Sequence, residues 1–151
     1  MSFAVLATMQ PLSAQIPEKN PDKNPLAQVK NLKCTFPSSS TGNWKGGLQA
    51  PLVKSDEIVL EIDSIDTQEG SARLVTAEPT YLTALLTASS IHFMERTLQG
   101  SLSVTTVFAI EGSPGKLRAV RSRHDYLKVT LPGYVSEPVV SQYYGECTPG
   151  K

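Results

Sequence analysis

The stretch from Ile91 to His124, IHFMERTLQGSLSVTTVFAIEGSPGKLRAVRSRH, decides the fold class. Its central part alternates apolar side chains with hydroxyl side chains, a period of two that predicts a β-strand with two different faces. The apolar positions are Leu102, Val104, Phe108 and Ile110, and the hydroxyl positions opposite them are Ser103 and Thr105. Glycine-containing turns separate this strand from extended segments on both sides, so we expect three antiparallel strands in a meander.

The same period continues on both sides of this stretch. Ile58, Leu60 and Ile62 alternate with mostly polar residues, and the turn at 66–70 leads into 71–75, which predicts a hairpin. The segment 81–87 fits either a strand or a helical stripe, and we favour a strand. Further candidate strands are Leu32 to Phe36, Tyr126 to Leu131 and Val139 to Cys147. About eight strands predict an all-β antiparallel meander that forms a closed or nearly closed small barrel, with a β-sandwich as the alternative.

The start of the chain predicts export. Residues 1–14 contain an apolar run from Phe3 to Met9 and end in small residues, which is typical of the back half of a signal peptide, although no basic residue precedes Lys19. The alternative is a frayed or locally packed N-terminus of a cytoplasmic protein. Residues 15–30 contain Lys-Asn-Pro twice and predict a proline-rich linker. The apolar run is too short for a membrane span. We therefore expect one β domain over 31–148, in the periplasm or secreted.

The charge balance argues against a nucleic-acid partner. The 151 residues carry 14 basic and 14 acidic side chains, so no net field attracts a polyanion. The charges are unevenly distributed, because residues 54–95 are mainly acidic and residues 96–128 mainly basic. Cross-strand pairs such as Glu95 with Arg118 would neutralise the two segments. The alternative is a basic surface able to hold an anion. Its residues would be Lys116, Arg118, Arg121, Arg123, Lys128, His124 and Tyr126.

Two cysteines bracket the predicted domain. Cys34 stands near its start and Cys147 near its end, so we expect a disulfide that closes nearly the whole domain. Such a bond fits an exported protein, and the alternative is a pair of unrelated buried thiols.

Few residues offer catalytic chemistry. His92 and His124 are the two histidines, and Ser122 would lie too far along a strand from His124 to share a proton with it. No pair of cysteines or histidines has metal-ligand spacing, and the chain has no phosphate-binding or dinucleotide motif. We therefore expect no catalytic residue, no metal and no cofactor.

Two short motifs resemble known families. Gly42-Asn43-Trp44 resembles the Gly-x-Trp signature of lipocalins and related calycin barrels, and this resemblance implies that Arg121 or Arg123 packs across the ring of Trp44. The ending Ser141 to Cys147, SQYYGEC, resembles uncharacterised exported bacterial β proteins, as do Ser-Arg-His at 122–124 and Thr-Thr-Val-Phe at 105–108. The same ending is also similar to that of small exported barrels that inhibit lysozyme.

These observations favour a binding protein without enzymatic activity. Its ligand would be a small amphiphile or anion in the barrel mouth. The expected ligand-binding residues are Trp44, Phe93, Phe108, Arg121, Arg123 and His124. One alternative is a protein interaction module, such as an inhibitor, that uses Tyr134, Tyr143 and Tyr144. A second alternative is a hydrolase with His124 as general base. We expect a monomer or weak homodimer whose partner is a small molecule or another protein.

Overall fold

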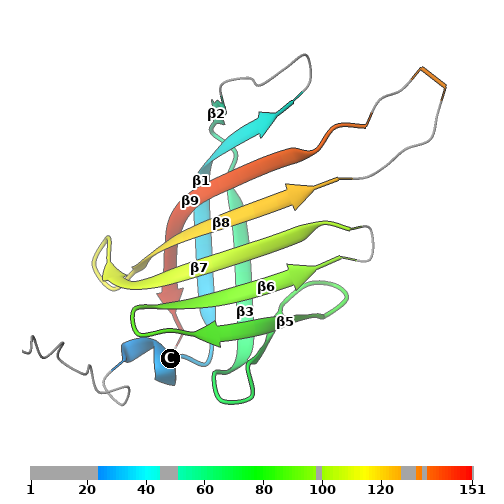
Figure 1. The fold of residues 1–151 in the computed structure, drawn as a ribbon. Coiled ribbons are helices and arrows are strands. Elements are labelled where there is room, and N and C mark those ends of the chain that lie inside the picture. Colours follow the sequence, from blue (N-terminus) through cyan, green and yellow to red (C-terminus); the bar gives the residue numbers. More distant parts are fainter. Residues whose placement is uncertain (1–23, 45–50, 98–99, 127–131, 134–135, 151) are drawn as a thin grey trace, which may run out of the picture.

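Antiparallel strands that follow one another in the chain make up almost all of the described part of the protein. The computed structural model describes residues 24–44, 51–97, 100–126, 132–133 and 136–150. Within these residues, nine strands form one sheet, preceded by a short 3-10 helix (Figure 1). The elements are η2 (Pro25–Gln28), β1 (Leu32–Asn43), β2 (Leu52–Lys54), β3 (Ile58–Asp66), β4 (Ser71–Leu74), β5 (Thr80–Leu86), β6 (Ser90–Arg96), β7 (Leu102–Glu111), β8 (Leu117–Asp125) and β9 (Val139–Pro149).

The sheet closes on itself because β1 pairs with strands on both of its sides. One side of β1 pairs with β9 from Leu32 to Asn43, and the other side pairs with β3 and, further along, with the short strand β2. Eight strands therefore form a closed antiparallel barrel, and β2 is an additional strand. The prediction of a small calycin-like barrel is confirmed, and the sandwich alternative is not adopted. The predicted meander is also confirmed, as β6, β7 and β8.

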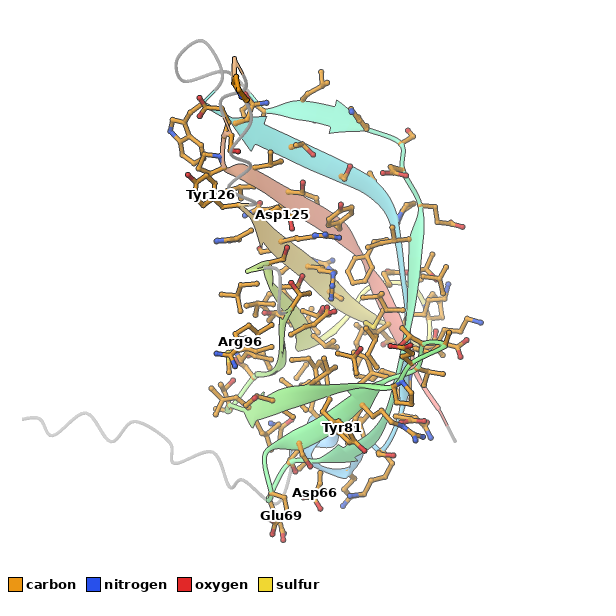
Figure 2. All side chains as sticks on the ribbon, turned by 90° about the vertical axis from the view of Figure 1, so that its right-hand side faces the viewer. Asp66, Glu69, Tyr81, Arg96, Asp125 and Tyr126 are labelled. Carbon is orange, nitrogen blue, oxygen red and sulfur yellow. A yellow bond between two sulfur atoms is a disulfide. The ribbon has the colours of Figure 1, made fainter. Side chains whose placement is uncertain are left out.

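Neighbouring strands run in opposite directions, so their connections alternate between the two ends of the barrel. The turns β3–β4, β5–β6 and β7–β8 lie at one end, and the connections β1–β2, β4–β5, β6–β7 and β8–β9 lie at the other. Figure 2 shows Asp66 and Glu69 at the first end and Asp125 and Tyr126 at the second. We call the first the closed end and the second the mouth.

Apolar side chains fill the interior toward the closed end. Phe36, Phe93 and Ile91 are fully buried there, as is Leu26 of η2. Proline at the first helical position and the side chain of Asn24, which accepts a hydrogen bond from the backbone N–H of Leu26, explain why η2 forms there. Asn24 also donates to the carbonyl oxygen of Thr87, 2.8 Å away, in the β5–β6 turn. Residues 24–30, expected in the linker, thus pack against the barrel, whereas 1–23 lie outside the described residues.

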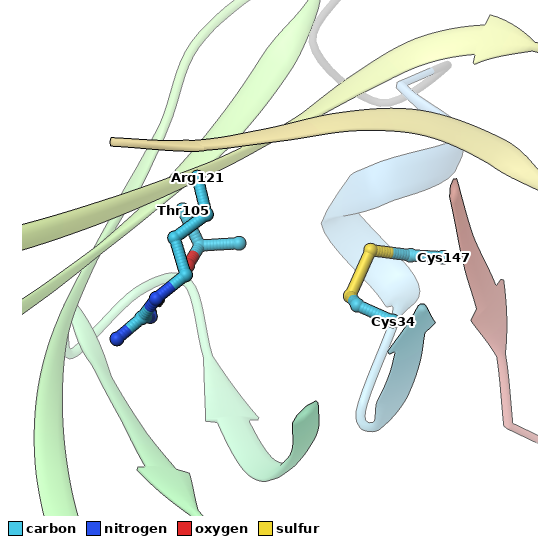
Figure 3. The surroundings of a disulfide bond; sticks show 4 residues. All are labelled: Cys34, Thr105, Arg121 and Cys147. Carbon is cyan, nitrogen blue, oxygen red and sulfur yellow. Dashed lines mark hydrogen bonds between the residues drawn. A yellow bond between two sulfur atoms is a disulfide. The ribbon is translucent and has the colours of Figure 1, made fainter. Parts of the chain in front are cut away.

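The disulfide joins the two strands that complete the ring. Cys34 of β1 lies directly opposite Cys147 of β9, and both residues are fully buried (Figure 3). The predicted bond is therefore confirmed, and it links the first strand of the barrel to the last.

A β-bulge in β1 depends on a glycine in β9. The pairing of β1 with β9 shifts by one residue between Thr35 and Ser38. At this bulge the backbone of β1 lies so close to Gly145 that a methyl group there would lie 2.0 Å from the Thr35 carbonyl oxygen. Only glycine fits this position without a backbone shift.

Two strand predictions have different outcomes. Residues 80–86 form the strand β5, with Leu82 and Ala84 buried and Tyr81 exposed, so the helical alternative for this segment is wrong. In β7 the period is right, but the inward side chains are Ser103, Thr105 and Val107. Tyr126 to Leu131 falls mostly outside the described residues.

Where the chain is described, no helix has the length and apolar character needed to span a bilayer.

Candidate functional site

Polar side chains occupy the mouth half of the barrel interior. Among them, Ser39, Ser103, Thr105 and Ser141 are each less than a tenth exposed. Ser103, Thr105 and Ser141 face inward because they continue the alternation of the buried residues on their strands. Ser39 faces inward because the β-bulge shifts the alternation of β1 by one residue after Phe36. Thr41 of β1 and Ser141 of β9 lie opposite each other, with their hydroxyl oxygens 3.1 Å apart. An interior lined by hydroxyl groups can form hydrogen bonds with a polar ligand.

Arg121 is the most deeply placed charge in this half. Its side chain points from β8 across β7 toward β6, and only 10% of it is exposed. Nη1 donates to Oγ1 of Thr105 at 3.0 Å, and Nη2 donates to Oε2 of Glu95 at 2.6 Å. Figure 3 shows the side chains of Arg121 and Thr105 lying together. The ion pair stabilises a guanidinium group in a place where an unpaired charge would be costly.

Arg123 lies two residues closer to the mouth on the same face of β8. Its side chain is 47% exposed, so the inward face of β8 becomes accessible to solvent between Arg121 and Arg123. Nε of Arg123 donates to the carboxylate of Asp125, with N–O distances of 2.8 and 3.0 Å. The terminal nitrogens of Arg123 have no partner among the residues that the structure describes. A guanidinium group has five N–H donors in a planar fork, and the contact of Nε with Asp125 uses one of them.

Asp125 is held in its charged form by this arrangement. Burial raises the pKa of Asp125, but hydrogen bonds from Ser101 and Arg123 and the positive charges of Arg123 and Arg121 lower the pKa more strongly. The net result is a pKa below the ordinary value of 3.8. Asp125 therefore stays ionised at neutral pH and fixes the orientation of Arg123.

Replacing Asp125 by asparagine tests this role through pH. A carboxyl group whose pKa is lower in the folded than in the unfolded state stabilises the fold at pH values above its unfolded pKa. That contribution disappears as the pH falls through the folded pKa. Near neutral pH we expect Asp125→Asn to lower the free energy of unfolding by less than about 1 kcal/mol, because Asp125 is partly exposed. The difference from the wild type should shrink as the pH falls below 3.8. Urea denaturation across this range measures it, and a difference that does not change with pH would contradict the assignment.

The structure separates the residues that sequence reasoning placed in one binding site. Arg121, Arg123 and Phe93 face the interior, although Phe93 is buried in the apolar core. Trp44 follows the last residue of β1 at the mouth and is 48% exposed. Both candidate arginines direct their guanidinium groups toward carboxylates, and not across Trp44 as the Gly-x-Trp resemblance implies.

Phe108 and His124 lie on the outer wall. Phe108 lines a shallow outer groove of about 520 Å³ together with Ile110, Val120 and Tyr144. His124 is exposed and lies opposite Val140 of β9. A ligand in the interior would contact neither Phe108 nor His124. The expectation that these two residues line the same site as Arg121 is therefore corrected.

The tyrosines expected at an interaction surface also separate. Tyr143 faces inward and packs against the core, whereas Tyr144 faces outward and is half-exposed. Tyr134 lies outside the described residues. Adjacent residues of a strand point to opposite faces, so Tyr143 and Tyr144 do not form one surface.

His92 is also on the outer wall, within a group of hydroxyl side chains. Its Nδ1 lies 2.9 Å from Oγ1 of Thr106, and its Nε2 lies 3.0 Å from Oγ of Ser90. In the described ranges, no three side chains of the metal-ligating types come together as a possible metal site.

Glu95 is the site residue that sequence reasoning assigned to the wrong partner. Glu95 was expected opposite Arg118, but Glu95 faces the interior and Arg118 faces outward. Strand parity was the available signal, because Glu95 continues the inward series of Ile91 and Phe93, just as Arg121 continues that of Ala119. The contact spans the intervening strand β7, so no rule for neighbouring strands predicts it.

Comparison with known proteins leaves the site to be interpreted from its own geometry. No protein-family model matches the chain, and a search of curated proteins finds no match.

Proposed function

We propose that this protein is a non-enzymatic binding protein whose ligand is a small anionic amphiphile held in the mouth half of the barrel. The observation that carries the proposal is the state of Arg123. It lies on the inward face at the mouth, its Nε is fixed by Asp125, and its terminal nitrogens have no partner among the described residues. A guanidinium group oriented in this way matches a carboxylate, which it can bind through two parallel hydrogen bonds.

The remainder of the interior supports this proposal. Arg121 and Glu95 neutralise each other below Arg123, so the deeper charges do not repel an anion at the mouth. The hydroxyl groups of Ser141 and Thr41 provide further donors on β9, which pairs with β8, and on β1, the next strand. Exposed apolar side chains near the mouth, with Trp44 foremost, can contact the alkyl part of the ligand.

The disulfide supports a location outside the reducing cytosol. Disulfides persist in the periplasm and outside the cell, where thiols are not kept reduced. A carrier or sensor of small amphiphiles in such a compartment agrees with the expected export of the chain.

Dodecanoate binding tests the proposal directly. Trp44 is the single tryptophan and lies at the mouth, so its fluorescence reports on ligand there. We expect dodecanoate to change the Trp44 emission and dodecanol, which has no charge, to bind more weakly. Arg123→Met should weaken dodecanoate binding by about ten- to a hundredfold, the loss expected for hydrogen bonds to a charged group.

The matched control is Arg96→Met, which removes an exposed arginine at the end of β6 on the outer face. It has the same change in charge and should leave dodecanoate affinity unchanged. Equal weakening by both variants would show that only overall charge matters. Unchanged affinity in Arg123→Met would overturn the proposed site.

The second candidate function is a protein interaction module on the outer wall. The observation in its favour is the apolar groove of Phe108, Ile110, Val120 and Tyr144, because partly exposed aromatic and aliphatic side chains in one groove are typical of interaction surfaces. Tyr144→Ala separates the two candidates. It should leave dodecanoate binding unchanged if the ligand occupies the mouth.

A further inference from the structure

The outer wall of the barrel has two different sides. On β1, β3 and β4 the outward side chains include two ion pairs, Lys33 with Glu61 and Arg73 with Asp63. The outward side chains of β5, β6 and β7 are mainly apolar, and Figure 1 looks onto these strands with β1 and β3 behind them. We call the large apolar side chains on this side the apolar wall: Tyr81, Leu85, Met94, Leu102, Phe108 and Ile110.

Much of the apolar wall is contiguous and accessible to solvent. Tyr81, Met94 and Leu102, from three neighbouring strands, line one shallow groove of about 480 Å³. Tyr81 is 82% exposed and Leu85 is 54% exposed. Single apolar side chains on a protein surface need no explanation, but a contiguous group of them indicates a contact with a partner.

The permanent charges on this side are positive. Among the outward residues of β5, β6, β7 and β8, Arg96 and Arg118 are permanently charged, and none is a carboxylate. Glu95 and Asp125 of these strands pair with arginines of the inward face. Glu111 accepts a hydrogen bond from the backbone of the β7–β8 turn. This side is therefore apolar and cationic, although the chain as a whole has no net charge.

We propose that the apolar wall docks the barrel on an anionic lipid surface. Proteins that lie on a bilayer bury apolar side chains among the headgroups, and their Lys and Arg side chains attract anionic lipids. Tyr81 suits this boundary, because a tyrosine ring is apolar and its hydroxyl group is polar. The ion pairs of β1, β3 and β4 then stay in water on the far side. This docking goes beyond the proposed function and does not depend on Arg123.

A lipid surface fits the apolar wall better than a second copy of the chain or another protein does. Two apolar walls packed face to face would bring Arg96 and Arg118 of both copies together with no outward carboxylate of β5–β8 between them. Burying charges without partners is costly. The wall is also the convex outside of a barrel, so a rigid partner would need a matching concave surface, whereas a fluid bilayer adapts to a convex one.

Binding to vesicles of defined composition tests the proposal. At low ionic strength, the wild type should sediment with sucrose-loaded vesicles of equal parts phosphatidylglycerol and phosphatidylcholine. Vesicles of phosphatidylcholine alone should bind it about fivefold or more weakly, the effect expected for one arginine near an anionic surface.

Two substitutions in or beside the apolar wall should weaken binding to the anionic vesicles. We expect a loss of about five- to tenfold for Leu85→Ser, which removes apolar surface that would be buried in the bilayer. Arg96→Gln should cost about fivefold. Arg118 is less informative, because Glu146 lies opposite it in β9 and partly neutralises it.

The matched controls lie away from the apolar wall. Val59→Ser removes an apolar side chain of similar exposure from β3, across the barrel from β7, and Lys54→Gln makes the same change in charge on β2. Both should bind the vesicles as the wild type does. Leu85→Ser and Arg96→Gln should keep the dodecanoate affinity of the wild type, so the docking and the ligand site in the mouth can fail separately. Circular dichroism of each variant checks that the barrel is intact.

Three results would overturn the proposal. One is a wild type that stays in the supernatant at millimolar lipid. Another is vesicle binding that neither Leu85→Ser nor Arg96→Gln weakens, because the protein would then use another surface. The third is a wild-type dimer in sedimentation velocity that Leu85→Ser dissociates, which would assign the apolar wall to a second copy.

Discussion

Replacing Cys34 and Cys147 by alanine is expected to lower the free energy of unfolding by about 2–5 kcal/mol. The bond joins residues separated by 113 positions, so it constrains nearly the whole unfolded domain. For loops near this length the chain-entropy model gives about 4.7 kcal/mol, and native-state strain can reduce it. The bond also holds β1 against β9, the pairing that completes the ring. Urea denaturation of the wild type and the double variant measures the loss.

Reduced wild-type protein is the matched control, because it keeps both sulfur atoms and so leaves no cavity in the core. It should lose a similar amount of stability. Both cysteines are fully buried, so dithiothreitol should reduce the bond only when the barrel opens, and much faster in urea than in its absence. A loss below about 1 kcal/mol for both proteins would contradict the role given to the bond, since native disulfides in small domains typically contribute more.

Replacing Arg121 by methionine is expected to lower the free energy of unfolding by about 2–4 kcal/mol, at or just below the range for breaking a fully buried ion pair. The variant leaves the Glu95 carboxylate in the interior, where 15% of its side chain is exposed, without the donor 2.6 Å away. It also removes the hydrogen bond that Thr105 accepts from Nη1. Most of the expected loss is the cost of the unpaired carboxylate.

A second substitution separates that cost from the loss of packing. Arg121→Met with Glu95→Gln has no charge in the deep interior, so the double variant should recover most of the lost stability. Its free energy of unfolding should lie above that of Arg121→Met alone. If the effects of Arg121→Met and Glu95→Gln on the free energy of unfolding simply add, the two side chains do not stabilise each other. That result would contradict the stabilising role of the ion pair between Arg121 and Glu95.

Alternation along the strands allowed much of the fold to be predicted. The series Ile58, Leu60 and Ile62 faces inward as expected, and the hairpin after it forms. Parity also placed Arg121 and Arg123 on the face of Ala119, where they lie. The position of the cysteines near both ends of the domain identified the disulfide. Local periodicity determines the faces of these strands, and the placement of the two cysteines determines the disulfide.

Which face of β7 points inward was not predictable from its pattern. The expected apolar face, which included Val104 and Phe108, points outward because the mouth half of the interior is polar. Alternation shows that a strand has two different faces, but it does not show which face is buried when the interior contains charges and hydroxyl groups. The same inversion explains why Phe108 was assigned to a site that it does not reach.

Leu26 and Glu95 required information from beyond their own segments. Leu26 lies among prolines and reads as linker, yet it fills the closed end because Asn24 anchors η2 to Thr87. Glu95 reaches Arg121 over an intervening strand, and that contact depends on the curvature of the barrel. Tertiary packing determines both positions, so sequence patterns alone do not specify them.

The most direct test of the mouth as the ligand site is a map of backbone amide chemical shifts during titration with dodecanoate. The proposal predicts that the largest changes lie on the inward residues of β8, β9 and β1 near the mouth, above all Arg123, Ser141 and Thr41, and that Arg123→Met abolishes them. Changes centred instead on the outer groove at Ile110, Val120 and Tyr144 would contradict the proposal and assign binding to the outer wall.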